Sequence, residues 1–493
     1  MLFNSYIFMF GFLPLMLLAV TVARGQSQRA VQLVVLMGSW IFYGWFVPAL
    51  ILLLIGSSLV NHTIGRWIES NRKSLLPLIA GLVFNLGLLA YFKYAGFLVA
   101  NVSALLGQSW AIENILLPLA ISFFTFQQVA YLVDLRRGTA SSPELIEYCL
   151  FVAFFPQLVA GPIVHHKELI PQLRKPTFGA LSVSGTQLAL VWFTIGLTKK
   201  VLFADQLAPI SDTIFTAADN GAHPSLLEAW SGVLAFTFQI YFDFSGYSDM
   251  AIGLGLLLGI SLPINFNSPY RATSIIDFWR RWHITLSRFL RDYLYVPLGG
   301  NRNGVPRRYA NLLLTMLLGG LWHGAAWTFV IWGGLHGLYL IVAHQWRRNF
   351  SAIPTMLGWV LTFIAVCMAW ALFRAETLPG AVAIIEGLVG QNGLVLAAEH
   401  RPLLGPAGDI LAAWGLNFEG VPEFRLRYLV LFPALIAAML LVPSTQELTR
   451  YLQTERSWIQ WRPTIVWGVT FGALLAIASL STQNATDFIY FQF

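Results

Sequence analysis

Charged residues are scarce in this chain of 493 residues, and their scarcity excludes an ordinary soluble protein. Only 11% of the residues are Asp, Glu, Lys or Arg, whereas soluble domains carry about 25%. Hydrophobic residues make up 57% of the chain. Apolar runs of about 20 residues recur along its whole length, and this is the length that crosses a bilayer core. The sequence therefore predicts a polytopic membrane protein.

Cysteine is almost absent, and several familiar catalytic motifs are missing. Cys149 and Cys367 both lie in apolar runs, so we expect inert packing thiols and no disulfide framework. The chain has no G-x-S-x-G elbow, no Walker A sequence, no Rossmann glycine run and no H-E-x-x-H. A hydrolase or an ATP-driven pump thus has no visible apparatus, and no metal is predicted. No basic run interleaved with aromatics predicts nucleic-acid binding, and the net charge of +7 is ordinary for a membrane protein.

The apolar runs predict an all-α protein with about eleven to thirteen transmembrane helices, forming a single integral-membrane domain over residues 1–493. The first run, MLFNSYIFMFGFLPLMLLAV, lacks the basic start and cleavage site of a signal peptide, so we expect a retained helix. Arginines 24 and 29, and later Arg72 and Lys73, mark the first and third loops as cytoplasmic, which places the N-terminus in the periplasm. The spans are expected near 2–22, 30–46, 48–64, 76–98, 112–132, 147–165, 185–204, 226–260 (one helix or two), 309–345 (one helix or two), 354–373, 378–395, 427–443 and 463–482.

Two acidic residues lie in the apolar stretch QIYFDFSGYSDMAIG. An ionisable residue at the centre of a span costs roughly 2.5–3.5 kcal/mol, so Asp243 and Asp249 each need a reason to be there. At helical spacing Gln239, Asp243 and Tyr247 share one face. A buried carboxylate needs a cationic partner, and the best donors are the arginines between 271 and 302.

The following segment, NFNSPYRATSIIDFWRRWHITLSRFLRDYLYVPLGGNR, places six arginines among aromatic residues. Read as a helix, it carries one stripe in which every fourth residue recurs: Trp279, His283, Ser287 and Arg291. Arg280 and Arg281 adjoin this stripe. An amphipathic interfacial helix with snorkelling arginines explains the basic and aromatic residues, but it explains His283 less well.

Two histidines occur in LWHGAAWTFVIWGGLHG, residues 321–337. On a continuous helix His323 and His336 would lie roughly 20 Å apart along the axis and about 220° apart around it. They could share a site only if the helix broke at Gly333–Gly334, so we do not expect a metal between them. A neutral histidine in a low-dielectric tunnel can act as a general base on a hydroxyl group. A structural role is the alternative for each of them.

These stretches, together with the terminal FIYFQF, resemble the membrane-bound O-acyltransferase family and, within it, the bacterial alginate O-acetyltransferase branch. The resemblance covers essentially the whole chain. The two long motifs, the arginine-rich segment and the segment with His323 and His336, are together specific for the family, whereas WHG alone is a weak signal. It implies an hourglass of tilted helices around a central tunnel that joins both membrane faces. It also implies that His323 matches the family's catalytic histidine, that His283 matches the second histidine of the D-alanyl-transfer branch, and that His336 is structural.

The resemblance further implies an O-acetyltransferase of the bacterial inner membrane. Acetyl would pass from cytoplasmic acetyl-coenzyme A, a co-substrate with no bound cofactor, to hydroxyls of an exopolysaccharide such as alginate or cellulose. A periplasmic acetyl-accepting or polysaccharide-modifying protein is the expected partner besides the lipid bilayer. We expect His323 to accept the proton of the attacking hydroxyl, and His283 to orient the acyl group or donate to the developing oxyanion. The expected substrate-binding residues are Arg280, Arg281, Ser287, Arg291, Asp243 and Trp322.

The coenzyme's phosphates would be attracted by arginines that the positive-inside rule explains equally well: Arg280, Arg281, Arg302, Arg307 and Arg308. Two other functions stay open at this point. Broken helices with buried Asp243 and Asp249 would suit a transporter of a saccharide or lipid-linked intermediate, although no inverted repeat is visible. A scaffold that anchors periplasmic proteins would leave the buried histidines unexplained.

Overall fold

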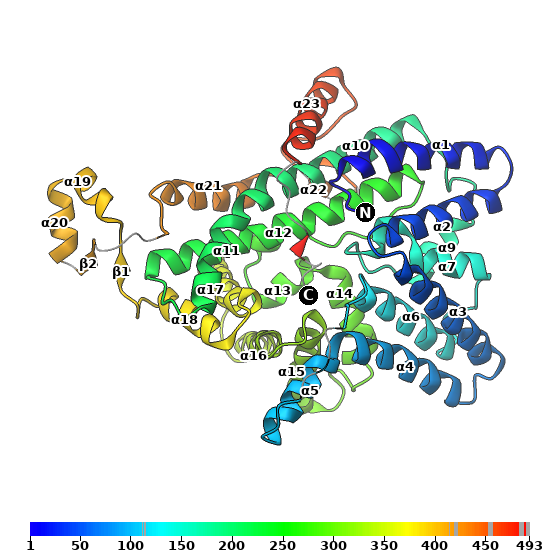
Figure 1. Cartoon of the computed structure of the whole chain (residues 1–493), viewed down its shortest axis with the longest axis horizontal. Helices are drawn as coiled ribbons and strands as arrows, with labels where there is room; N and C mark the ends of the chain where they lie inside the picture. Colours follow the sequence, from blue (N-terminus) through cyan, green and yellow to red (C-terminus); the bar gives the residue numbers. More distant parts are fainter. Residues whose placement is uncertain are drawn as a thin grey trace.

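The structure is a computed structural model, and it describes residues 1–110, 112, 115–413, 415–418, 423–451, 457–482 and 488–489. Helices dominate it, and the strands in these residues are a two-residue parallel pair, β1 (Leu394–Val395) and β2 (Leu416–Asn417) (Figure 1). Six helical runs within the described ranges are long and apolar enough to cross a membrane: Ile7–Arg24, Ala49–Ser70, Leu76–Leu105, Val183–Asp219, Trp327–Asn349 and Thr355–Arg374. Three apolar helices are shorter: Leu378–Leu388, Tyr428–Leu441 and Ile465–Ser481. The chain is therefore a multi-pass membrane protein, while the count of eleven to thirteen spans stays a prediction.

The N-terminal part packs around a core of aromatic rings. Its elements are η1 (Ile7–Phe12), α1 (Leu13–Arg24), α2 (Gln28–Gly44), α3 (Ala49–Ser70), α4 (Leu76–Leu89), η2 (Ala90–Tyr94), α5 (Ala95–Leu105), α6 (Ile121–Arg136), α7 (Leu145–Ala153), α8 (Phe155–Leu158) and α9 (His166–Leu173). Two expected spans are wrong in their bounds. The helix expected over 112–132 begins only at Ile121, after Pro118 and a left-handed Ala120. The helix expected over 147–165 is interrupted at Phe154, before Pro156, and ends at Leu158.

One long helix, α12 (Leu226–Leu257), runs through the centre of the molecule and packs against α10 (Val183–Thr198), η3 (Lys199–Ala204) and α11 (Asp205–Asp219) (Figure 1). A capping box formed by Ser225 and Glu228 starts it. Its 32 residues span about 48 Å, more than the bilayer core, so the helix has to tilt within a membrane. The stretch 226–260 is thus a single helix.

The acidic residues of α12 are paired with lysines, not with the arginines expected as their partners. Lys200 Nζ lies 2.7 Å from Asp243 Oδ1 and 2.8 Å from Asp205 Oδ1. Lys199 Nζ lies 2.6 Å from Asp249 Oδ2. The two lysines belong to η3, which packs directly beside α12, so this neighbouring element supplies the charge. These ion pairs hold helices together within the core.

The second half contains the breaks that build the site. Its elements are η4 (Pro269–Arg271), α13 (Ile275–Arg281), α14 (Ile284–Leu290), η5 (Arg291–Tyr295), α15 (Gly304–His323), α16 (Trp327–Asn349), α17 (Thr355–Arg374) and α18 (Leu378–Leu388). The stretch 309–345 is a pair of helices, α15 and α16, separated at residues 324–326. The helix does not break at Gly333–Gly334, since both glycines lie inside α16. A Cβ on Gly333 would lie 2.2 Å from Met316 O, so this glycine allows α16 to pack closely on α15.

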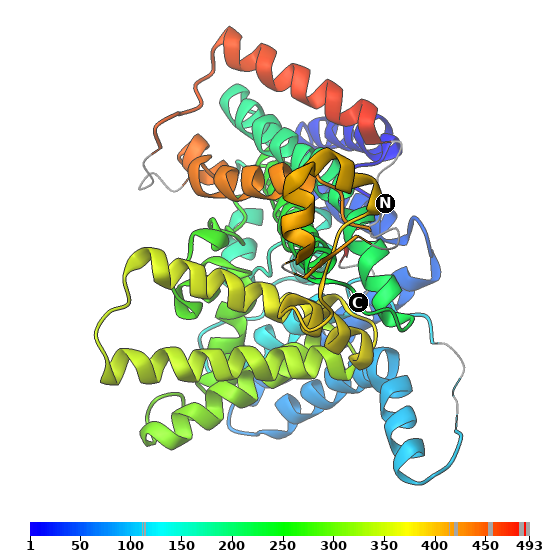
Figure 2. The same ribbon diagram turned by 90° about the vertical axis from the view of Figure 1, so that its left-hand side faces the viewer.

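The remaining elements are η6 (Ala398–His400), α19 (Arg401–Leu404), α20 (Pro406–Ala413), α21 (Tyr428–Leu441), α22 (Thr445–Thr449) and α23 (Ile465–Ser481). Figure 1 shows α19, α20 and the two short strands as a lobe that projects from one end of the molecule. Figure 2 shows α23 along one edge, and α16 beside α17. The lobe stands apart from the core in which the histidines lie.

Candidate active site between two helix breaks

Two interruptions of the helical backbone bring His283 and His323 together. His283 adopts a left-handed conformation, φ 42° and ψ 53°, between the end of α13 and the start of α14. His323 is the last residue of α15, just before the extended Gly324. Their ring centroids lie 6.3 Å apart, and their exposed fractions are 0% and 4%. The expectation that His283 lies near His323 is confirmed.

The continuous helical stripe expected from Trp279 to Arg291 is wrong, because the helix breaks at His283. The break turns His283 into the core. Trp279, Ser287 and Arg291 nevertheless line one cavity together, because α13 and α14 both border it. The four-residue spacing thus correctly grouped Trp279, Ser287 and Arg291 on one surface, but not His283.

Aromatic rings surround the histidine pair. Phe244 of α12 packs edge-on against His283, with ring centroids 4.7 Å apart. Trp332 and Phe373 contact His323 at 5.1 and 5.3 Å. A site enclosed in this way excludes water, and electrostatic interactions inside it are stronger than they are in solvent.

His336 lies closer to His323 than expected. The hairpin folds α16 back along α15, so both imidazoles pack against Trp332, His336 at 4.9 Å and His323 at 5.1 Å. Trp279 Nε1 donates a hydrogen bond to His336 Nδ1 at 3.3 Å. His336 therefore accepts a hydrogen bond from Trp279 and shares the contact with Trp332 that His323 also makes.

A first cavity of about 560 Å³ opens between α13, α14 and α15. Six polar side chains line it together with Trp279: Arg280, Ser287, Arg288, Arg291, Tyr295 and Thr315. Arg280, Ser287 and Arg291 are expected binding residues, and the structure brings them together. The sequence did not single out Arg288, which forms a two-pronged ion pair with Glu168 at 2.6 and 2.9 Å.

Arg281 and Asp243, both expected to bind substrate, are engaged elsewhere. Arg281 Nε pairs with Asp277 at 3.0 Å, and its guanidinium also donates to the carbonyl of Asn267. Asp243 is held by Lys200. Neither side chain lines the basic cavity or the small cavity at His323, so their role in substrate binding stays a prediction.

A second, smaller cavity of about 70 Å³ borders His323 itself. Lys93, Ser122 and Trp322 line it, among apolar residues of 117–123. The first cavity touches α15 no nearer than Met316, seven residues or about 10 Å before His323 along the helix axis. The two cavities thus contact α15 at different positions along its axis. Trp322, an expected binding residue, borders the smaller one.

Lys93 fixes the end of α15. Its ammonium donates to the carbonyl oxygens of Trp322 at 2.7 Å and His323 at 3.0 Å, and to Ser122 Oγ at 3.3 Å. The last carbonyls of a helix have no partner within the helix, and a cation there also complements the helix dipole. Sequence reasoning overlooked Lys93, although it is the one charged residue in the apolar run 76–98 and the cost of its burial was a usable signal.

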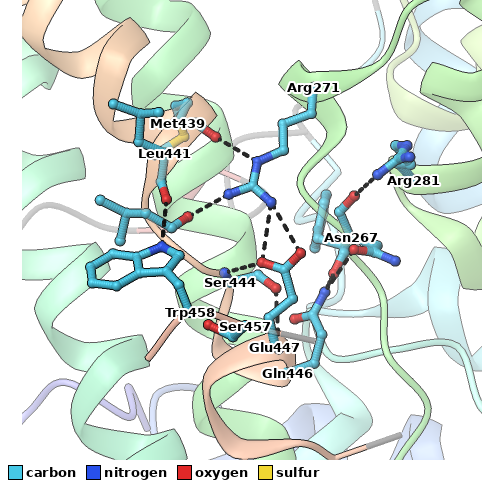
Figure 3. A network of polar contacts seen from close by, with 12 residues as sticks. Asn267, Arg271, Arg281, Met439, Leu441, Ser444, Gln446, Glu447, Ser457 and Trp458 are labelled. Atoms are coloured by element: carbon cyan, nitrogen blue, oxygen red, sulfur yellow. Dashed lines mark hydrogen bonds and ion pairs between the residues drawn. The ribbon is translucent and has the colours of Figure 1, made fainter. Parts of the chain in front are cut away.

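The backbone before α13 is clamped by the short helix α22, and Figure 3 shows the contacts. Arg271 donates to the carboxylate of Glu447 at 3.0 and 3.2 Å and to carbonyl oxygens at the end of α21. Gln446 Nε2 donates to Asn267 Oδ1 at 3.2 Å. This segment carries Asn265, whose Oδ1 lies 3.1 Å from His283 Nδ1. The clamp therefore supports the backbone on which His283 rests.

Fold and site together define a polytopic helical membrane protein with a buried histidine pair, a small cavity that borders His323 and a basic cavity that reaches Ile284. The sequence profile of MBOAT, the membrane-bound O-acyltransferase family, matches residues 81–376, which include both histidines. The chain belongs to this family and is an acyltransferase, as the motifs predicted.

Known relatives point to O-acetylation. The chain is 38% identical to a peptidoglycan O-acetyltransferase of Helicobacter pylori, with 100% of this chain and 98% of that protein aligned. It is 42% identical to a probable alginate O-acetylase of Pseudomonas aeruginosa, over 86% of this chain and 82% of the relative. A teichoic acid D-alanyltransferase of Bacillus subtilis is more distant, at 26% identity over 68% of this chain and 90% of its own length.

Proposed function

We propose that the protein transfers acetyl from cytoplasmic acetyl-coenzyme A to a hydroxyl presented from the periplasm, on the way to a cell-surface glycan such as alginate. The observation that carries the proposal is the buried pair of His283 and His323, with a small cavity bordering His323 and a basic cavity that reaches Ile284, the residue after His283. The names of the relatives support O-acetylation and differ in the polymer.

The first cavity suits a thioester donor. Arg280 places positive charge along it, while Arg288 and Arg291 lie there in ion pairs with Glu168 and Asp292 that a phosphate would have to open. Guanidinium groups bind phosphate in two-pronged geometry. The charged coenzyme cannot cross hydrocarbon, so its adenine and phosphates stay at the basic face while the thioester arm reaches inward. The volume of about 560 Å³ accommodates such an arm.

We take the basic cavity to open on the face that carries the basic loops. Gln28, after the first loop, donates to the carbonyl of Lys175, and Arg72 donates to the carbonyl of Ala140. Arg137 reaches the carbonyl of Asp292, next to the cavity residue Arg291. By the positive-inside rule this face is cytoplasmic, so we place the protein in the inner membrane with its N-terminus in the periplasm.

In the proposed reaction His323 accepts the proton of the attacking hydroxyl. The hydroxyl oxygen bonds to the thioester carbonyl carbon, the carbon–sulfur bond breaks, and the coenzyme leaves as a thiol after taking up a proton. His283 lies next to His323, with ring centroids 6.3 Å apart. The aromatic enclosure keeps water from competing with the acceptor.

The acceptor enters through the second cavity. At about 70 Å³ this cavity is far too small for a polysaccharide chain, but it fits a small hydroxyl-bearing group. We therefore propose that a periplasmic partner protein presents the hydroxyl, for example on a serine, and passes the acetyl group on to the polymer.

Purified protein in detergent, with acetyl-coenzyme A labelled in the acetyl group, tests the function. Wild type should bind coenzyme A and transfer or slowly hydrolyse the label, whereas His323→Ala should bind normally and move none. Arg280→Glu should weaken binding at least tenfold, and added salt should weaken it further. Arg401→Glu, in the projecting lobe, is the matched control and should bind normally.

Full activity of His323→Ala would refute the assignment of the base. A different result would favour transport. If wild type neither binds the coenzyme nor moves label, while reconstituted vesicles take up a saccharide, the protein is a transporter and the acyl-transfer proposal fails.

A further inference from the structure

A chain of hydrogen bonds that starts at a backbone amide shows which terminal atom of the Asn265 side chain is the oxygen and which is the nitrogen. The N–H of Ile163 donates to Thr285 Oγ1 at 3.0 Å, so this oxygen is an acceptor there. The hydroxyl hydrogen of Thr285 is then directed to Asn265 Oδ1, 2.9 Å away. The backbone N–H of Thr285 points to the same atom at 3.3 Å. Because an amide N–H can only donate, this atom of Asn265 is the carbonyl oxygen and not the amide nitrogen.

The same oxygen lies 3.1 Å from His283 Nδ1. A carbonyl oxygen only accepts, so Nδ1 carries the hydrogen of this contact. In a neutral imidazole one nitrogen donates and the other accepts. We infer that Asn265 is a positioning residue that holds neutral His283 as the Nδ1–H tautomer, with the lone pair on Nε2.

The surroundings of Asn265 keep it from turning over. Its Nδ2 points to Ser248 Oγ of α12 at 3.4 Å, and its own carbonyl accepts the N–H of Ile284 at 2.9 Å. Its exposed fraction is 1%. His283 itself is in the left-handed region, a conformation that residues other than glycine rarely adopt. Such a conformation persists where contacts on several sides over-determine it.

The tautomer decides between the two roles expected for His283, and this step rests on the proposed acyl transfer. A neutral ring with its lone pair on Nε2 accepts a hydrogen bond or a proton there. It cannot donate from Nε2 to a developing oxyanion. His283 therefore assists as a hydrogen-bond acceptor beside His323, which takes the proton of the attacking hydroxyl and returns it to the sulfur when the carbon–sulfur bond breaks.

Nitrogen NMR on the wild-type protein tests the tautomer without any acetyl transfer. Protein with ¹⁵N-labelled histidine rings is compared with His283→Gln, which identifies the His283 signals by their loss. At neutral pH we expect a protonated Nδ1 and an unprotonated Nε2. A signal pair with the hydrogen on Nε2 would overturn the inference. Because this readout is independent of the reaction, failure of the proposed function would show separately, as the absence of transfer.

Kinetics of two substitutions tests the positioning role. Asn265→Asp keeps an acceptor oxygen, and kcat should stay within about tenfold of wild type. Asn265→Leu removes the oxygen, and kcat should fall about 100-fold, the upper end of the effect of removing the orienting partner of a metal-bound histidine. The KM for acetyl-coenzyme A should change less than about threefold, because Asn265 borders neither cavity.

Asn85→Leu is the matched control. Asn85 is also 1% exposed and hydrogen-bonds Asn61 between α4 and α3. Its replacement removes an equally buried amide outside the site and should leave kcat unchanged. Wild-type kcat in Asn265→Leu, or an equal fall in Asn265→Asp and Asn265→Leu, would overturn the inference. If Asn265→Leu fails to fold, the NMR of the wild type still decides.

Discussion

Replacing Lys93 with methionine should lower both stability and turnover. Methionine fills the apolar volume but donates no hydrogen bond. The change removes charge-assisted bonds of 2.7 and 3.0 Å to the carbonyls of Trp322 and His323. Each is worth about 1.5–3 kcal/mol. Part of this is offset, because burying an ammonium group is itself unfavourable, so we expect a net loss of about 2–4 kcal/mol.

The effect on catalysis follows from the same contacts. Without Lys93 the end of α15 is free to shift, and a displacement of about 1 Å at a reacting group lowers a rate by as much as 100-fold. We expect kcat for acetyl transfer to fall about 10- to 100-fold. The KM for acetyl-coenzyme A should stay near the wild-type value, since Lys93 borders the small cavity and not the basic one.

Thermal unfolding in detergent and the labelled-acetyl assay measure the two effects of this change. Lys73→Met is the matched control, because Lys73 lies exposed in the loop between α3 and α4. It should leave both quantities unchanged. If Lys93→Met has wild-type stability and kcat, or if it weakens only coenzyme binding, the reasoning about the end of α15 is wrong.

Two further predictions concern His336 and the orientation of the chain. His336→Gln offers Trp279 a new acceptor and should keep kcat within a few-fold of wild type; a loss as deep as that of His323→Ala would instead place His336 in the chemistry. Ser5→Cys should react with a membrane-impermeant maleimide on intact cells, because the proposed topology places the N-terminus in the periplasm. The native Cys149 and Cys367 are buried and should not contribute to the labelling. Labelling only after lysis would reverse the proposed topology.

Sequence reasoning found the two histidines but not the geometry that joins them. Helical periodicity assumes a continuous helix, and the backbone at His283 leaves it for the left-handed region. The contact that stabilises this departure comes from Asn265, 18 positions earlier. No local pattern contains that information, so the residue was predictable as a candidate and its surroundings were not.

The charged partners were missed for a similar reason. Spacing placed Asp243 on a helix face but did not reveal which element packs there, and the nearest cation proved to be Lys200 of η3. The role of a glycine was ambiguous in the same way, because a glycine can mark a helix break or a close helix–helix contact. Gly333 was considered only as a place for a break, but the structure needs a glycine there because the backbone of α15 passes within contact distance. Tertiary packing decides both questions.

Placing both histidines at helix breaks has a chemical consequence. A break lets rings from two separate segments face one another, which one continuous helix cannot achieve for residues 40 positions apart. It also leaves backbone carbonyls without helical partners, and in a dry core they need donors. Lys93 supplies these donors for the carbonyls beside His323, while Asn265 holds the ring of His283. The supports of the histidines therefore differ from the arginines of the basic cavity, and the two sets should separate in kinetics, the first acting on kcat and the second on the KM of the donor.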